Sequence, residues 1–164
     1  MKQIYCLTVA LLLISALTGC VSPGSIAPNT TSADELVKQL GKPTETRLNP
    51  QGGEIWDYVY GPQGTATWRY SVDKGGVVRS AEQLLTHERL YKVVPGETTE
   101  AGVIELLGKP GKINRYRHEV AWEWRVDLNA NRGHYVVRFG FDGVARGVIV
   151  LEDMFIDGGD KGRK

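Results

Sequence analysis

Two short stretches of the chain share one pattern of apolar and polar residues. Residues 31–43 (TSADELVKQLGKP) and residues 98–110 (TTEAGVIELLGKP) each place their apolar side chains on one side of a helix. These apolar residues are Leu36, Val37 and Leu40 in the first stretch, and Val103, Ile104 and Leu107 in the second. The repeated pattern therefore predicts one short helix in each half of the chain.

The helix boundaries are predicted by residues with known preferences at helix ends. Ser32, with Glu35 three residues later, has the form of a capping box, and Thr98 is expected to cap the second helix. Gly41 and Gly108 stand where a helix ends in the left-handed conformation. A proline follows two residues after each glycine and cannot continue a helix, so we interpret the phrase Leu-Gly-Lys-Pro as a helix stop.

An alternation of apolar and polar residues, typical of half-buried β-strands, follows each helix. It runs through residues 52–61 and 66–78 in the first half, and through residues 119–127 and 135–144 in the second. Weaker strands are expected over residues 44–48 and 112–117, and an additional helix over residues 86–94. Turn sequences such as DKGG and NANRG separate the strands and predict antiparallel hairpins.

Together these elements predict an α+β fold, a tandem repeat in which a short helix packs on a three- to four-stranded antiparallel meander. A single repeat buries little core, so the two are expected to associate into one domain. The predicted segments are a signal peptide (1–19), a tether (20–31), a first repeat (32–85), a second repeat (86–155) and a polar tail (156–164).

The first twenty residues have the pattern of a bacterial secretion signal. Lys2 precedes an apolar run from Ile4 to Leu17, which is short for a membrane span. The phrase Leu-Thr-Gly-Cys that ends at Cys20 resembles the lipobox of bacterial lipoproteins. The resemblance implies cleavage before Cys20, lipidation of Cys20 and anchoring in a membrane; Val21 favours the outer membrane, with the domain facing the periplasm. An ordinary cleaved signal and a single membrane anchor are the alternatives.

Composition argues against several classes of function. The 20 basic and 19 acidic residues give a formal net charge of +1, so no nucleic-acid partner is expected. Cys6 lies in the predicted signal and Cys20 is the predicted lipidation site, which leaves no cysteine for a disulfide or a nucleophile. His118 and Glu119 begin a zinc-protease phrase that lacks its second histidine. We therefore expect no catalytic residue, metal, cofactor or small-molecule substrate, and no enzymatic activity.

The aromatic residues of the strands fall on the faces that the alternation assigns to the core. The opposite faces carry charges of both signs and scattered apolar residues, which suit a protein partner better than a lipid. This candidate partner-binding face consists of Ile55, Asp57, Val59, Arg69, Glu123, Arg125 and Arg138. An ordinary solvated sheet surface is the alternative interpretation.

Three phrases of the second half resemble one protein family. They are PGETTEAGVIELLGKP (95–110), VAWEWRV (120–126) and VVRFGFDGV (136–144). Following a lipobox-like signal, they are similar to the SmpA/OmlA domain of the BamE family of small outer-membrane lipoproteins. The resemblance covers residues 86–153 and, more weakly, residues 31–85. It implies a non-catalytic accessory role in the assembly of outer-membrane β-barrel proteins or in envelope integrity, with a protein partner in the assembly machinery.

The tandem layout also resembles that of the β-lactamase inhibitory proteins. This second resemblance implies an alternative function as a periplasmic inhibitor that binds an enzyme. Such an inhibitor is expected to expose an aromatic-rich surface, because interface hot spots favour Trp, Tyr and Arg. The alternation directs most of the aromatic residues inward, and so it favours the accessory role.

Overall fold

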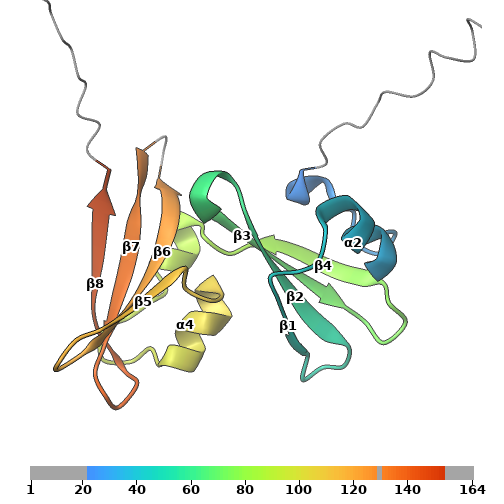
Figure 1. Ribbon diagram of the computed structural model, residues 1–164. Coiled ribbons are helices and arrows are strands. Elements are labelled where there is room, and N and C mark those ends of the chain that lie inside the picture. Colours follow the sequence, from blue (N-terminus) through green and yellow to red (C-terminus); the bar gives the residue numbers. More distant parts are fainter. Residues whose placement is uncertain (1–21, 129–130, 154–164) are drawn as a thin grey trace, which may run out of the picture.

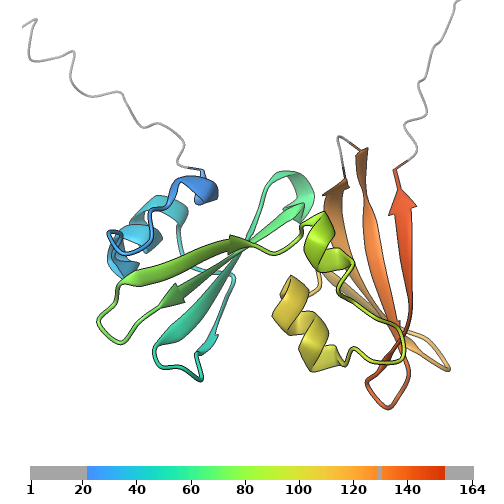
Figure 2. The same ribbon diagram turned by 180° about the vertical axis from the view of Figure 1, so that it is seen from behind.

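A computed structural model describes residues 22–128 and 131–153, which form two four-stranded sheets (Figures 1 and 2). The first sheet has the order β1-β2-β3-β4 and the second the order β5-β6-β7-β8, with every neighbouring pair antiparallel. The strands of the first sheet are β1 (Glu45–Leu48), β2 (Glu54–Tyr60), β3 (Ala66–Val72) and β4 (Val78–Gln83). Those of the second are β5 (Lys112–Arg115), β6 (Val120–Leu128), β7 (Asn131–Phe139) and β8 (Ala145–Glu152).

In the described part of the chain, three short α-helices and two 3-10 turns accompany the sheets. The α-helices are α2 (Ala33–Leu40), α3 (His87–Leu90) and α4 (Glu100–Leu107), and the 3-10 turns are η1 (Pro23–Ser25) and η2 (Pro62–Gly64). Helix α4 lies between the second sheet and the first, whereas α2 lies on the far side of the first sheet (Figures 1 and 2).

The predicted α+β fold class, with its SmpA/OmlA-like helix-on-sheet repeat, is wrong. The described chain is mostly antiparallel sheet, and its three α-helices contain only eight, four and eight residues. The predicted meanders are present, but the alternation continues beyond their Asp-Gly turns into β4 and β8, two strands that the sequence pattern did not locate. These additional strands shift the balance of the fold from helix to sheet.

The predicted helix ends are confirmed with one shift. The Ser32 hydroxyl accepts a hydrogen bond from the Glu35 amide, and Gly41 and Gly108 end their helices with φ of 82° and 74°. Helix α4 is capped by Thr99 rather than Thr98, because the Thr98 hydroxyl is already taken by the amide of Val94. Both glycines adopt φ values that other residues rarely reach.

Each sheet covers its own apolar core. The core of the first sheet consists of Ile26, Leu36, Tyr58, Tyr70, Val72 and Val78. The core of the second consists of Leu85, Leu90, Val93, Val103, Leu107, Trp124, Val126, Tyr135, Val137, Phe139 and Ala145. Ile26 and the buried Pro23 show that part of the segment predicted as a tether packs on the first sheet. The alternation predicted over residues 135–144 directs Phe141 into the core together with Phe139. This direction is wrong for Phe141, because β7 ends at Phe139 and Phe141 lies exposed in the following turn.

Equivalent hydrogen bonds join each sheet to the end of a helix. The Tyr58 hydroxyl donates to the carbonyl of Gly41 at 3.1 Å, and the Trp124 indole donates to the carbonyl of Gly108 at 3.2 Å. In both cases an aromatic residue of the second strand satisfies a carbonyl at a helix C-terminus, where partners within the helix are lacking.

Buried tyrosine hydroxyls are expected to make the fold sensitive to alkaline pH. Burial raises the pKa of Tyr58 and of Tyr135 to about 12, and burial followed by the nearby Tyr58 raises that of Tyr70 further. A folded-state pKa above the unfolded value means that the folded chain holds more protons, so stability is complete below about pH 10 and falls as the pH rises towards 12. Denaturant unfolding measured at intervals between pH 9 and pH 12 tests this expectation.

Replacing one of these buried tyrosines with phenylalanine removes the hydroxyl group that titrates. Tyr135→Phe is expected to reduce the alkaline loss of unfolding free energy, although it also removes the hydrogen bond to the Leu90 carbonyl at every pH. Tyr91→Phe, at a position that is 82% exposed, is the matched control. An alkaline loss that is the same in Tyr135→Phe and in the unaltered chain would contradict the assignment.

Candidate functional site

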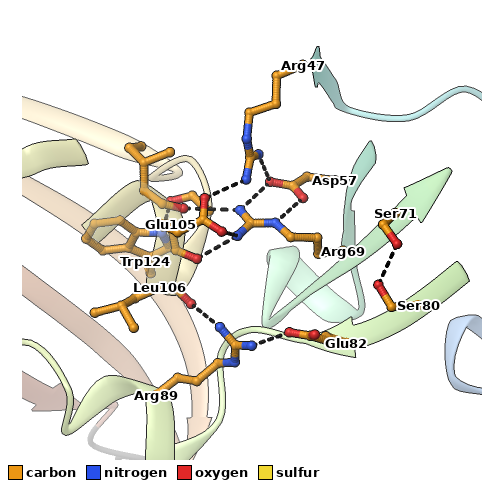
Figure 3. A network of polar contacts seen from close by, with 12 residues as sticks. Arg47, Asp57, Arg69, Ser71, Ser80, Glu82, Arg89, Glu105, Leu106 and Trp124 are labelled. Carbon is orange, nitrogen blue, oxygen red and sulfur yellow. Dashed lines mark hydrogen bonds and ion pairs between the residues drawn. The ribbon is translucent and has the colours of Figure 1, made fainter. Parts of the chain in front are cut away.

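The candidate residues of the first sheet share one face, and two of them are buried. Asp57 of β2 and Arg69 of β3 are directly opposite in the strand register, and only 4% and 7% of their surfaces are exposed. Ile55 is partly buried on the same face, and Val59 is exposed near the end of β2. This face points towards α4 of the second half, which supplies the burial (Figure 3).

Arg69 and Asp57 form the centre of a polar network (Figure 3). The Nε and Nη2 atoms of Arg69 contact the two carboxylate oxygens of Asp57, each at 2.8 Å, in a bidentate ion pair. Arg47 of β1 adds a third contact to Asp57 at 3.1 Å and reaches Glu105 of α4 at 3.0 Å. One buried carboxylate is thus shared by two guanidinium groups.

The same network holds the C-terminal end of α4. Arg69 donates to the carbonyls of Ile104 at 3.1 Å and Glu105 at 2.5 Å. Arg89 of α3 donates to the carbonyl of Leu106 at 3.3 Å and pairs with Glu82 of β4. Carbonyls at a helix C-terminus carry partial negative charge, so two arginines are favourable partners for them.

A cleft of about 550 Å³ opens beside this network. Its walls are formed by Arg47, Leu48, Asn49, Pro50, Gln51, Ile55, Arg69, Ser71, Ser80, Glu82, Arg89 and Glu105. The hydroxyls of Ser71 and Ser80 lie 2.8 Å apart and hydrogen-bond to each other. Each of the three arginines has a carboxylate partner, so the charges of the cleft compensate one another. This arrangement suits a rigid joint between the two sheets better than the capture of a charged ligand.

The candidate residues of the second sheet lie elsewhere. Glu123, Arg125 and Arg138 belong to the face that points away from the core, where Arg138 lies 3.5 Å from Glu119. Glu123 accepts a hydrogen bond from His134 at 2.6 Å, and Arg125 contacts both His134 and Asp153. The structure therefore divides the predicted face into two parts, one centred on the buried Asp57 and Arg69 in the joint and one of partly buried residues on the outer face of the second sheet.

Sequence reasoning missed the partners that complete the joint. Arg47, Arg89 and Glu105 were not identified, because their contacts join segments far apart in the chain. The only local signal was an arginine and an aspartate at facing positions of two predicted strands. Cys20, the predicted lipidation site, lies outside the described residues.

Two further features concern the membrane and metals. Among residues 22–128 and 131–153, no helix has the length and apolar character needed to cross a membrane. The same residues contain no group of three or more His, Cys, Asp or Glu side chains arranged to hold a metal ion.

Comparisons with known proteins leave the family open. No family model matches the chain, and no curated protein matches it. Among solved structures, a DUF4309 family protein (YjgB) from Bacillus subtilis is similar over 79% of this chain and 83% of its own, with 16% identity and a TM-score of 0.31. This likeness is too low to carry a fold or a function from one chain to the other.

Proposed function

We propose that this chain is a lipoprotein of the bacterial outer membrane, anchored through Cys20, with a non-catalytic role in binding another protein. The observation that carries the binding role is the charge balance of the cleft, where Arg47, Arg69 and Arg89 are each paired with a carboxylate. Because these arginines are already paired within the joint, they are not available to a ligand, and we expect a partner to bind the outward surfaces instead. The signal-like residues 1–20 support the anchor.

The proposed partner is the machinery that assembles outer-membrane β-barrel proteins. The resemblance of residues 86–153 to the BamE family supports this choice. The corresponding surface is the outer face of the second sheet, where Glu123, Arg125 and Arg138 surround the partly exposed Val136. Charges of both signs around an apolar centre are typical of protein interfaces.

Affinity isolation from outer membranes tests the proposal. The full chain with a C-terminal tag is expressed in its cell envelope, crosslinked and recovered, beside a Cys20→Ala variant. We expect barrel-assembly subunits to be enriched with the unaltered chain and absent with Cys20→Ala. Absence of these subunits from both samples would contradict the proposed partner, and equal recovery in both would contradict the role of the anchor.

A surface variant tests the proposed face. Arg138→Glu reverses a charge on the outer face of the second sheet, and Arg115→Glu does so on the exposed β5 of the same sheet. We expect Arg138→Glu to lower the recovery of assembly subunits and Arg115→Glu to preserve it. Equal losses would show that the effect depends on net charge alone.

A periplasmic inhibitor is the second candidate, and one observation favours it. Tyr116 and Phe141 are exposed in the β5–β6 and β7–β8 turns, which lie at the same end of the second sheet. Aromatic side chains at loop tips are suitable anchors for an enzyme cleft. Recovery of a soluble periplasmic enzyme, unaffected by Cys20→Ala and lost with Phe141→Ala, would favour the inhibitor over the accessory role.

A further inference from the structure

Strand β8 forms an open and unusually apolar edge of the second sheet. It is the last strand in the order β5-β6-β7-β8 and has the sequence ARGVIVLE. Ile149, Val150 and Leu151 are 39%, 50% and 53% exposed. Natural sheets usually protect an edge of this length with charges, proline or a covering segment, because unpaired backbone groups bind other strands.

The hydrogen bonds around β8 show which of its backbone groups face outward. The amide of Asp153 donates to the carbonyl of Arg132 at 2.8 Å, so Asp153 directs its backbone towards β7. Backbone direction alternates along an antiparallel strand, and Leu151 and Ile149 therefore face β7 as well. By the same alternation Val148, Val150 and Glu152 direct their N–H and C=O groups away from the sheet.

Within residues 22–128 and 131–153, only the beginning of this edge is covered. The amide of Ala145 donates to the carbonyl of Thr98 at 2.9 Å, and its carbonyl accepts from the amide of Gly96 at 2.8 Å. Among the residues that the structure describes, none hydrogen-bonds to the outward backbone groups of Val148, Val150 or Glu152. Three residues with six backbone groups are thus available to a further strand.

We propose that a second copy of this chain occupies the edge, with the two β8 strands antiparallel about a two-fold axis at Ile149. For two β8 strands to hydrogen-bond, residues with outward backbone N–H and C=O groups must lie opposite each other. An axis at Ile149 meets this condition, because it places Val148 opposite Val150 of the other copy. The two Ile149 residues then form a close pair without hydrogen bonds between them. The two sheets become one continuous eight-stranded sheet, in the isologous geometry of a symmetric dimer.

Charge complementarity identifies both the occupant and the register. About Ile149, Arg146 of each copy lies opposite Glu152 of the other, which gives two ion pairs at the ends of the apolar segment. An axis at Val150 also satisfies the backbone, but it places Glu152 opposite Val148, so that Arg146 and Glu152 no longer face each other. Opposite charges at facing positions stabilise a strand pair, so the axis at Ile149 is favoured. The inference stands on the edge itself and does not depend on the proposed function.

Sedimentation equilibrium of the full chain in detergent micelles, over a range of concentrations, tests the dimer. We expect a dimer for the unaltered chain and at least tenfold weaker association for Ile149→Lys, which brings two ammonium groups together at the axis. Ile113→Lys, at a 45% exposed position on the opposite edge strand, is the matched control and should dimerise normally. Thermal unfolding followed by circular dichroism verifies that both variants are folded.

A charge swap tests the register. Glu152→Arg places Arg146 opposite an arginine in both pairs and is expected to weaken the dimer roughly tenfold, because two cross-strand pairs become repulsive. Arg146→Glu should weaken it as well, although it also removes the contact of Arg146 with Asp142 in its own hairpin. The double variant, Arg146→Glu with Glu152→Arg, restores opposite charges and should restore the dimer.

Three results would overturn the inference. The first is a monomer of the unaltered chain at every concentration measured. The second is a dimer that forms equally well with Ile149→Lys, which would locate the interface elsewhere. The third is a double charge swap that associates no better than its single components, which would exclude the axis at Ile149.

Discussion

Replacing Arg69 with alanine is expected to lower the free energy of unfolding by about 3–5 kcal/mol. The guanidinium group of Arg69 and the carboxylate of Asp57 are both buried and contact each other through two hydrogen bonds. Removal of the arginine leaves a buried carboxylate with Arg47 as its remaining partner. The carbonyls of Ile104 and Glu105 lose their donor at the same time.

Urea unfolding of the full chain measures this loss, with Arg79→Ala as the matched control. Arg79 pairs with Asp73 on the surface of the first sheet, where an ion pair contributes less than about 1 kcal/mol. A loss in Arg69→Ala no larger than that in Arg79→Ala would show that the joint is not stabilised by its ion pair.

A double replacement separates the cost of a broken pair from the value of an intact one. Arg69→Met combined with Asp57→Leu removes both charges and leaves no buried ion. We expect this variant to be more stable than Arg69→Ala, because a lone buried carboxylate costs more than an apolar pair of similar size. The difference in free energy of unfolding that remains between this double variant and the unaltered chain would measure the hydrogen bonds to the α4 carbonyls, which the methionine cannot make.

Local chemistry explains what the sequence predicted correctly. Glycine is needed where the backbone takes a positive φ, and Gly41 and Gly108 end their helices for that reason. Alternation along a strand follows from its geometry, so it correctly assigned Tyr58 and Trp124 to the cores. It failed at Phe141 because it extended the pattern past the last residue of β7.

The fold class and the joint depend on contacts that no local pattern contains. The short helices and the fourth strands β4 and β8 changed the balance of the fold, although the DKGG turn that precedes β4 is predicted from the sequence. Alternation correctly predicts that Asp57 and Arg69 lie on the face opposite the core. It gives no information about which segment covers that face. The cover comes from α4, more than thirty residues further along the chain.

Trp124→Ala is the second change with a large expected effect, a loss of about 3–5 kcal/mol in the free energy of unfolding. Trp124 is 2% exposed and lies among Trp122 and Tyr135 in the core of the second sheet. Its replacement by alanine leaves a cavity and also removes the donor to the Gly108 carbonyl. Trp56→Ala is the control, since Trp56 is only partly buried and should cost less.

Trp124→Phe divides the loss into its two parts. Phenylalanine keeps most of the apolar volume but has no N–H, so the Gly108 carbonyl stays buried without its donor. We expect a loss of about 1–3 kcal/mol for this variant, the cost of an unsatisfied buried polar group. A loss in Trp124→Phe equal to that in Trp124→Ala would mean that the hydrogen bond, and not the packing, dominates.

Trp124 and Arg69 hold the same helix end from opposite sides. Trp124 binds the carbonyl of Gly108 from the second sheet, and Arg69 binds those of Ile104 and Glu105 from the first (Figure 3). If the end of α4 acts as one rigid support, the first of the two replacements loosens it and the second costs less than it would alone. A double-mutant cycle of Arg69→Ala and Trp124→Phe is therefore expected to be non-additive by at least about 0.5 kcal/mol. Strict additivity would show that the two sheets hold α4 independently.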